Sequence, residues 1–252
     1  MIVKPISMLV SSCALLLTLL AGCGHSTLQS SPANSNNVPT SSQDGKSPAG
    51  GVDNSAPPKS SPPVRDTRPV IVAFGDSLTA GYGTNAGQSY PDYLQQDLNA
   101  LGYRYRVVNA GISGNTSKDG VARLPEIVAR LPTVAIIAFG GNDGLRGVPI
   151  LDTEMNLRTM IATLQDAHVK VILGGITLPP NYGGDYIAKF DAIYRKQSHA
   201  YHVPLLPFML KDVYGVPGDM QADGIHATAK GNEQVAKNFL PLLLPLLHKG
   251  PK

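Results

Sequence analysis

The chain has 252 residues, of which 42% are hydrophobic and 15% charged, and its formal net charge is +3. This length and composition allow one sizeable hydrophobic core, or two smaller domains. Because no basic stripe is interleaved with aromatic side chains, a nucleic acid is not expected as a partner. The two cysteines are Cys13 and Cys23, so the chain beyond them has no thiol for a disulfide, a zinc site or nucleophilic catalysis.

Residues 1–22 have the features of an export signal. One cation, Lys4, precedes the apolar stretch "ISMLVSSCALLLTLLAG", which is too short and too serine-rich for a comfortable membrane span. The stretch ends in "LAGC", which resembles the bacterial lipobox. That resemblance implies cleavage before Cys23 and attachment of lipid to its sulfur, which predicts an exported bacterial lipoprotein with a membrane anchor. The alternative is an ordinary secretory signal with a chance cysteine.

Residues 23–69 are predicted to hold the lipidated cysteine and a disordered tether. The tether is rich in Ser, Pro, Asn and Gly and has almost no large apolar residue, so it cannot bury enough surface to offset its ordering entropy. As a flexible coil of about 45 residues it would span on the order of 35–40 Å. Gly24 does not resemble the Asp that commonly retains lipoproteins at an inner membrane, which favours an outer membrane, on its periplasmic or surface side.

Past Pro69, short apolar runs alternate with longer segments of helical period. The predicted strands are 70–74, 105–109, 134–139, 169–175 and, more weakly, 203–208. The predicted helices are 90–102, 117–131, 153–168, 187–202 and a last one from about Ala229. Strands that are apolar on both faces and are joined by helices indicate a parallel sheet covered on both sides. The fold class is therefore α/β: residues 70–248 are expected to form a three-layer flavodoxin-like α/β/α sandwich with a five-stranded sheet.

In such a fold, ligands bind outside the carboxyl ends of the strands. The first four predicted strands are followed in turn by "GDSLTAG", "NAGISGNTS", "GGNDG" and "ITLPPNYGG". Three of these four segments are rich in Gly, Ser and Asn, and the predicted site lies where they meet.

Ser77 stands on a sharp corner directly after the first strand. An isolated G-D-S is usually a turn, whereas a serine nucleophile needs a base, and the base needs an orienting partner. Asp223 and His226 are three residues apart in "ADGIHAT", so a turn can bring the carboxylate to one imidazole nitrogen and leave the other facing Ser77. A lone D-x-x-H is more often a solvated turn, but this one precedes the last helix and can return to the same sheet edge.

Acyl transfer also needs hydrogen-bond donors for the oxygen that becomes negative. Gly114 lets the backbone approach such an oxygen closely, and the side-chain amide of Asn142 can point into the same space. The amide N–H of Ser77 would be the third donor. Each of these residues, taken alone, is also compatible with ordinary turn chemistry.

The four segments "GDSLTAG", "NAGISGNTS", "GGNDG" and "DGIH", in this order, resemble the four blocks of the SGNH hydrolases, also called GDSL esterases/lipases. By that resemblance, Ser77 is the nucleophile, His226 the base and Asp223 the acid that orients it. Gly114, Asn142 and the amide of Ser77 correspond to the oxyanion hole. No metal or organic cofactor is implied.

The resemblance covers about 70–247, and further segments such as "GNDGLRG" and "MQADGIH" are similar to the bacterial branch of arylesterases, acyl thioesterases and lysophospholipases. No G-x-S-x-G elbow occurs, which disfavours the common α/β-hydrolase arrangement. Two departures are the residue after the catalytic His, usually Pro and here Ala227, and the long lipidated leader. The first removes no catalytic group, and the second bears on the compartment.

Two further groups of residues bear on a pocket and on a metal site. The segment "LPPNYG" after the fourth strand, with Leu178, Pro180 and Tyr182, is a weak candidate for the acyl pocket, since Pro and Gly also suit a surface crossover. His199 and His202 are three apart on a predicted helix, but without nearby Cys or an H-E-x-x-H pattern they do not indicate a metal site.

These inferences predict a monomeric, lipid-anchored serine hydrolase of small-molecule or lipid esters or thioesters. An O-acetyl esterase of cell-envelope carbohydrate is an alternative within the enzymes. A lipoprotein that binds lipid or glycan without catalysis is an alternative from another class.

Overall fold

The computed structural model describes residues 66–249. These residues include a parallel sheet of five strands. The strands are β1 (Val70–Gly75), β2 (Arg106–Gly111), β3 (Val134–Ala138), β4 (Lys170–Gly174) and β5 (Leu205–Leu206). Their order in the sheet is β2-β1-β3-β4-β5, and every neighbouring pair is parallel. This is the flavodoxin-like order, so the predicted fold class is confirmed. The predicted signal, Cys23 and most of the tether lie outside the described residues.

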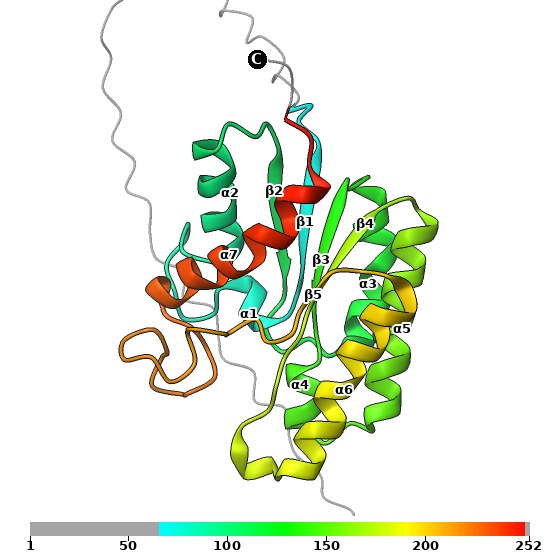
Figure 1. The fold of residues 1–252 in the computed structure, drawn as a ribbon, viewed down its shortest axis with the longest axis vertical. Coiled ribbons are helices and arrows are strands. Elements are labelled where there is room, and N and C mark those ends of the chain that lie inside the picture. Colours follow the sequence, from blue (N-terminus) through cyan, green and yellow to red (C-terminus); the bar gives the residue numbers. More distant parts are fainter. Residues whose placement is uncertain (1–65, 250–252) are drawn as a thin grey trace, which may run out of the picture. The chain divides into compact units, whose positions relative to one another are not determined.

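Helices cover both faces of the sheet (Figure 1). The elements are α1 (Ser77–Ala80), α2 (Tyr90–Ala100), α3 (Ser117–Ala129), α4 (Gly141–Leu145), α5 (Ile150–Asp166), η1 (Pro180–Tyr182), α6 (Gly184–Tyr201), α7 (Ala229–Leu243) and η2 (Leu244–Leu246). Helices α2 and α7 pack together on one side, and α3, α5 and α6 pack on the other. No helix of residues 66–249 has both the length and the hydropathy to cross a bilayer.

Helices α2 and α3 begin at the predicted residues, where capping residues and amphipathic period agree. Helices α5 and α6 begin three residues before the predicted segments, and neither has a capping side chain. Both Ser89 and Thr116 begin a helix with a capping box, in which an Asp three residues later accepts from the capping backbone N–H. Such a cap stabilises a helix by about 1 kcal/mol. The short helices α1 and α4 were not predicted, since four or five residues show no helical period.

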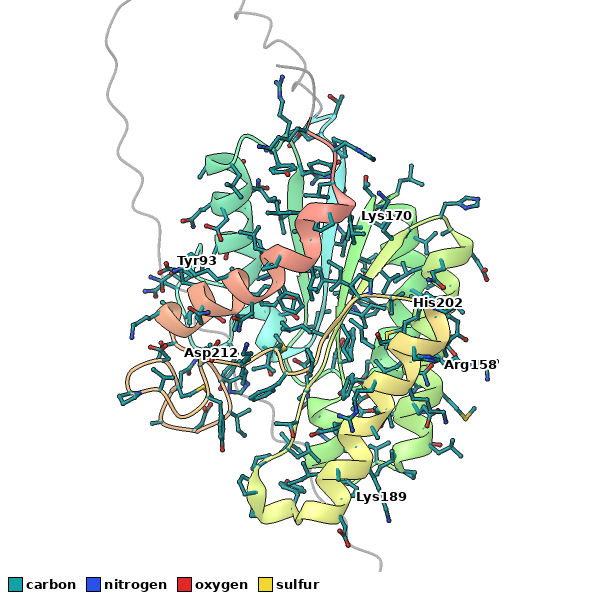
Figure 2. The ribbon with its side chains drawn as sticks, viewed as in Figure 1. Tyr93, Arg158, Lys170, Lys189, His202 and Asp212 are labelled. Carbon is teal, nitrogen blue, oxygen red and sulfur yellow. The ribbon has the colours of Figure 1, made fainter. Side chains whose placement is uncertain are left out.

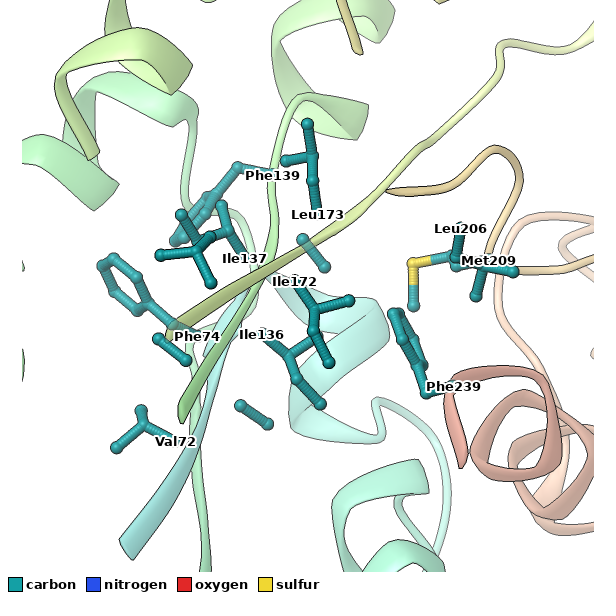
Figure 3. Close-up of a cluster of buried hydrophobic side chains, with 14 of the residues drawn as sticks. Val72, Phe74, Ile136, Ile137, Phe139, Ile172, Leu173, Leu206, Met209 and Phe239 are labelled. Atoms are coloured by element: carbon teal, nitrogen blue, oxygen red, sulfur yellow. The ribbon is translucent and has the colours of Figure 1, made fainter. Parts of the chain in front are cut away.

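The core lies on both faces of the sheet (Figure 3). Phe74 and Phe139 meet edge to face at 4.8 Å between ring centroids, on the face covered by α3 and α5. Ile136 and Ile172 point to the other face, where Phe239 of α7 packs. All five side chains are fully buried. Because both faces of the sheet are covered, strands β1, β3 and β4 have apolar residues at successive positions.

The fifth strand is shorter than predicted. Of the range 203–208, only Leu205 and Leu206 form a strand beside β4. Pro204 and Pro207 flank this pair, and because proline has no backbone N–H it cannot extend the ladder. The sheet therefore ends at this edge, and the chain turns away into the loop before α7.

Candidate active site

A close-packed turn places Ser77 at the carboxyl end of β1. A Cβ atom at Gly75 would lie 2.1 Å from Thr79 Oγ1 and 2.6 Å from the Ala138 carbonyl oxygen, so only glycine allows this approach. The side chain of Asp76 then caps α1 by accepting from Leu78 N at 3.0 Å. Ser77 is the first residue of α1, so its own N–H has no intrahelical acceptor.

The loop before α7 returns to Ser77 from 149 positions further along the chain. His226 Nε2 lies 2.8 Å from Ser77 Oγ, and His226 Nδ1 lies 2.6 Å from Asp223 Oδ2. Asp223 Oδ1 also accepts from the backbone N–H groups of Ile225 and His226, at 2.9 and 3.0 Å. The three side chains form a continuous relay from carboxylate to imidazole to hydroxyl.

The electrostatics of this relay favour one tautomer of the imidazole. Burial by itself would raise the pKa of Asp223, but the hydrogen bonds it accepts from His226 and Ile225 outweigh burial and lower that pKa to about 2. An ionised carboxylate can only accept, so the proton of the ring sits on Nδ1. His226 Nε2 is then free to accept the hydroxyl proton of Ser77.

Two further predicted residues lie at the carboxyl ends of the neighbouring strands. Gly114 has a φ of +82°, a conformation that side chains with a Cβ rarely adopt, and it is exposed in the loop after β2. Asn142, in α4, donates from Nδ2 to the carbonyl oxygen of Asn115 at 2.9 Å. The amide has a second N–H, and Asn142 lines the cavity beside Ser77.

Two arginines that the sequence analysis missed hold this loop. Arg146 donates from Nη2 to the Gly114 carbonyl at 3.1 Å and lies 3.4 Å from Asn142 Oδ1. Arg123 donates to Asn115 Oδ1 at 2.9 Å and to the carbonyl of residue 110 at 2.7 Å. Arg146 is four residues after Asn142, a spacing that places two side chains on one helix face, and this was the available signal.

The sequence analysis also missed Gln221, which connects the loop of His226 to the segment that follows Ser77. Its Nε2 donates to the Tyr82 carbonyl at 2.6 Å and to the Ala227 carbonyl at 2.8 Å, while its backbone N–H donates to the His226 carbonyl at 2.8 Å. The Tyr82 ring lies against the imidazole, with 4.6 Å between centroids. Gln221 thus fixes the histidine loop to the chain that follows α1, and no sequence pattern indicates this contact.

The acidic residues beside Ser77 and Asn142 are buried. Asp143 accepts from Ser117 N at 2.8 Å, from Ser117 Oγ at 2.5 Å and from Thr153 Oγ1 at 3.3 Å, so it joins α3, α4 and α5. Asp76 is 1% exposed. Burial raises the pKa of Asp76 to about 7, and the nearby carboxylate of Asp143 adds to the effect, although the hydrogen bond from Leu78 N acts against it.

We expect the Asp76→Asn variant to lose most of the pH dependence of stability between pH 4 and 7. The folded-state pKa of about 7 lies above the ordinary value of 3.8. As the pH rises, the unfolded chain therefore releases this proton first, and folding loses on the order of 4 kcal/mol by pH 7. Asparagine keeps the acceptor for Leu78 N and has no proton to release. Urea unfolding at pH 4, 5.5, 7 and 8 measures the free energy of unfolding. The same dependence of this free energy on pH in both proteins would contradict the prediction.

A cavity of about 510 Å³ opens beside Ser77. Its walls are mainly apolar and include Leu178, Pro180, Phe208, Leu210 and Ile225. Leu178 and Pro180, two of the weak pocket candidates, line this cavity. Tyr182, the third, is not among the lining residues, because its hydroxyl donates to the Leu145 carbonyl at 3.0 Å and joins η1 to α4 instead.

Within residues 66–249, no group of three or more His, Cys, Asp or Glu is placed to hold a metal ion. His199 and His202 lie near each other, with 6.4 Å between their ring centroids, and both are exposed.

The chain is similar in sequence and in structure to known proteins. Residues 73–234 match the GDSL-like Lipase/Acylhydrolase family. The chain is 43% identical over 178 residues to the protein named Esterase TesA of Pseudomonas aeruginosa, which spans 70% of this chain and 89% of that protein. It is 39% identical over 179 residues to the Escherichia coli protein named Thioesterase 1/protease 1/lysophospholipase L1, spanning 71% and 85%. The crystal structure of TesA superposes with a TM-score of 0.69, at 43% identity, covering 71% of this chain and 99% of that one.

Proposed function

This chain belongs to the GDSL-like lipase/acylhydrolase family and is a serine esterase, and we propose that Ser77, His226 and Asp223 carry its reaction. The observation that supports this assignment best is the pair of short contacts on either side of the imidazole, 2.8 Å to Ser77 Oγ and 2.6 Å to Asp223 Oδ2. The substrates are carboxylic esters or thioesters.

In the proposed reaction, Ser77 Oγ attacks the acyl carbonyl carbon while His226 Nε2 takes the hydroxyl proton. The carbonyl oxygen gains a negative charge, which the N–H of Ser77, the backbone N–H of Gly114 and the amide of Asn142 stabilise. Each such donor contributes about 3–4 kcal/mol in the transition state. His226 then protonates the leaving alcohol or thiol. Water, activated by the same imidazole, releases the acid from the acyl-enzyme and returns the proton to Ser77.

We propose that the acyl chain occupies the apolar cavity beside Ser77. Each methylene of the acyl chain that is buried in the cavity is expected to raise kcat/KM about fourfold, because a buried methylene contributes about 0.8 kcal/mol. We therefore expect kcat/KM to rise about 250-fold over the four methylenes that separate p-nitrophenyl acetate from the hexanoate. A panel of p-nitrophenyl esters from two to sixteen carbons measures this.

The matched variant for this panel is Ile187→Phe, at another wall residue of the cavity. Its larger ring is expected to lower activity on the octanoate while leaving the acetate rate nearly unchanged. A preference of the unmodified chain for the acetyl ester would instead favour an O-acetyl esterase of carbohydrate. No turnover of any ester would favour a lipoprotein that only binds lipid or glycan.

We also propose that the protein is a lipoprotein, exported through residues 1–22 and held in a membrane by lipid on Cys23. The support is the "LAGC" sequence at the end of the apolar segment. An outer membrane is favoured by Gly24, and the folded part is proposed to act as a monomer. Mass spectrometry of the mature chain tests the anchor, since it predicts an acylated cysteine at the N-terminus.

A further inference from the structure

The end of the sheet opposite the active site forms a distinct surface. We call it the amino-end surface, because its segments precede the strands or follow the last helix. These segments are 66–70, 101–106, 130–134, 166–170, 202–205 and 244–249. The sheet is parallel, so the amino ends of all its strands meet at this one edge.

Contacts between these segments hold the surface together. Arg68 Nη1 donates to the Tyr105 carbonyl at 3.3 Å, and the Tyr105 hydroxyl accepts from His248 N at 3.1 Å. Lys170 Nζ donates to the Leu246 carbonyl at 2.7 Å. Figure 2 shows Lys170 toward this end of the molecule and Lys189 toward the other. The last described residues therefore lie beside the first strand, in agreement with Figure 1.

The amino-end surface has an excess of positive charge. Its cations are Arg68, Arg104, Arg106, Arg130, Lys170 and Lys249, and its acids are Asp66 and Asp166. Arg68 and Arg106 are both paired with Asp66, and Arg130 is paired with Glu126 in α3. The remaining described residues hold ten Lys or Arg against fourteen Asp or Glu. The described part of the chain is thus cationic at one end and anionic over the rest.

Exposed leucines lie among these cations. Leu131, at 83% exposure, is the most exposed large hydrophobic side chain of the described residues, and it follows Arg130 directly. Leu101 is 42% exposed in the same surface, three residues before Arg104. Apolar side chains next to basic ones are the composition of segments that rest on a bilayer, where the cations meet headgroups and the leucines reach the acyl boundary.

From these observations we propose that the amino-end surface docks on the anionic phospholipid headgroups of a membrane. Each Lys or Arg near such a surface adds attraction that is short-ranged and is screened by salt. A nucleic acid would also attract the cations but offers no apolar layer for Leu131. Exposed apolar side chains such as Tyr82 and Tyr214 also lie near the active site, but the acidic excess away from the amino-end surface opposes their approach to an anionic bilayer.

The orientation has a consequence for substrate access, which rests on the proposed function. The six residues of β1 separate the amino-end surface from Ser77 by about 20 Å. Docked in this way, the active site opens toward the aqueous phase. It then receives esters or thioesters that arrive dissolved in water rather than lipids still held in that bilayer.

The first test uses the chain from Asp66 to its end, which contains all five strands and the core but not the predicted lipid site. We expect it to cosediment with vesicles of phosphatidylglycerol and phosphatidylcholine, less so in high salt, and not with phosphatidylcholine alone. The double variant Arg104→Glu/Lys249→Glu is expected to bind these vesicles at least about tenfold more weakly. Its matched control, Lys118→Glu/Lys189→Glu, changes net charge equally outside the surface and is expected to bind as before.

Equal loss in both double variants would overturn the proposal, because it would reflect net charge alone. Binding of duplex DNA as tight as binding of the vesicles at the same salt concentration would overturn it as well. None of these measurements depends on catalysis, so their failure leaves the esterase assignment standing, and a failed esterase assay leaves the docking result standing.

A second measurement reports the orientation. The chain from Asp66 has no cysteine, so one can be introduced and labelled with an environment-sensitive fluorophore. On anionic vesicles we expect a blue shift for the label at Leu131→Cys and none for the label at Ala188→Cys, which is exposed on α6 beside Lys189. A shift at position 188 without one at position 131 would show the opposite orientation and overturn the proposal.

Discussion

The Ser77→Ala variant is expected to lower kcat/KM for a p-nitrophenyl ester by about 10⁴-fold or more. The residue supplies the only hydroxyl oxygen for which the structure shows a hydrogen bond to the imidazole of His226. Without it there is no covalent acyl-enzyme, and water must attack directly. What remains is catalysis by the oxyanion donors and by substrate binding, which in serine hydrolases with such a triad is about 10³–10⁴ above water.

A fluorophosphonate probe tests the same assignment independently of turnover. It should label the unmodified chain, fail to label Ser77→Ala, and still label Ser113→Ala. Ser113 is the matched control, since it is an exposed serine in the loop after β2, next to Gly114. Labelling of the Ser77→Ala variant would show that another residue is the nucleophile.

The Asp223→Asn variant is expected to lower kcat by about 10⁴-fold while the fold is kept. The asparagine oxygen still accepts from the N–H groups of Ile225 and His226, which now bond to Oδ1 at 2.9 and 3.0 Å. Its NH₂ group, however, faces His226 Nδ1, where the structure has an acceptor at 2.6 Å. The ring must then carry its proton on Nε2, and a protonated Nε2 cannot accept the hydroxyl proton of Ser77.

Steady-state kinetics and thermal unfolding together measure this effect. The expected pattern is a loss of kcat with KM and Tm close to those of the unmodified chain. Asp212→Asn is the matched control, because Asp212 is an exposed carboxylate whose ion pair is with Lys211, and it should leave both kinetic constants unchanged. A kcat for Asp223→Asn within tenfold of the original would show that Asp223 does not hold the tautomer.

The fold was predictable from the sequence because its local and long-range signals agree. Strands β1 and β3 are apolar and buried on both faces. Helices α2, α3 and α7 begin after a capping Ser or Thr and have an amphipathic period at the expected place. The prediction was least accurate at β5. Only two of its residues pair with β4, because Pro204 and Pro207 flank them. The short helices α1 and α4 could not be predicted, since tertiary contacts at Gly75 and the site loops form them rather than helical propensity.

The residues of the candidate site also include some that the sequence predicted and some that it did not. Ser77, Gly114 and Asn142 were predicted from residue chemistry at strand ends, and Asp223 and His226 from the loop before the last helix. In the structure all five lie at the same edge of the sheet. Gln221, Arg123 and Arg146 were not identified, because each acts through a backbone carbonyl of a distant or neighbouring loop. Any residue type presents such a carbonyl, so the sequence contains no signal for these backbone contacts. The spacing of Asn142 and Arg146 indicates only that these two side chains share one helix face.

The sequence alone determined which groups are chemically able to react and which fold carries them, since both depend on residue type, period and order along the chain. Only the tertiary structure decided which groups meet. The 2.8 Å contact between residues 77 and 226, the room in the apolar cavity and the gathering of cations at the amino-end surface all join segments far apart in the chain. Their physical reason is the packing of helices on a parallel sheet, which aligns the strand ends into two opposite surfaces, one with the reactive groups and one with the positive charge.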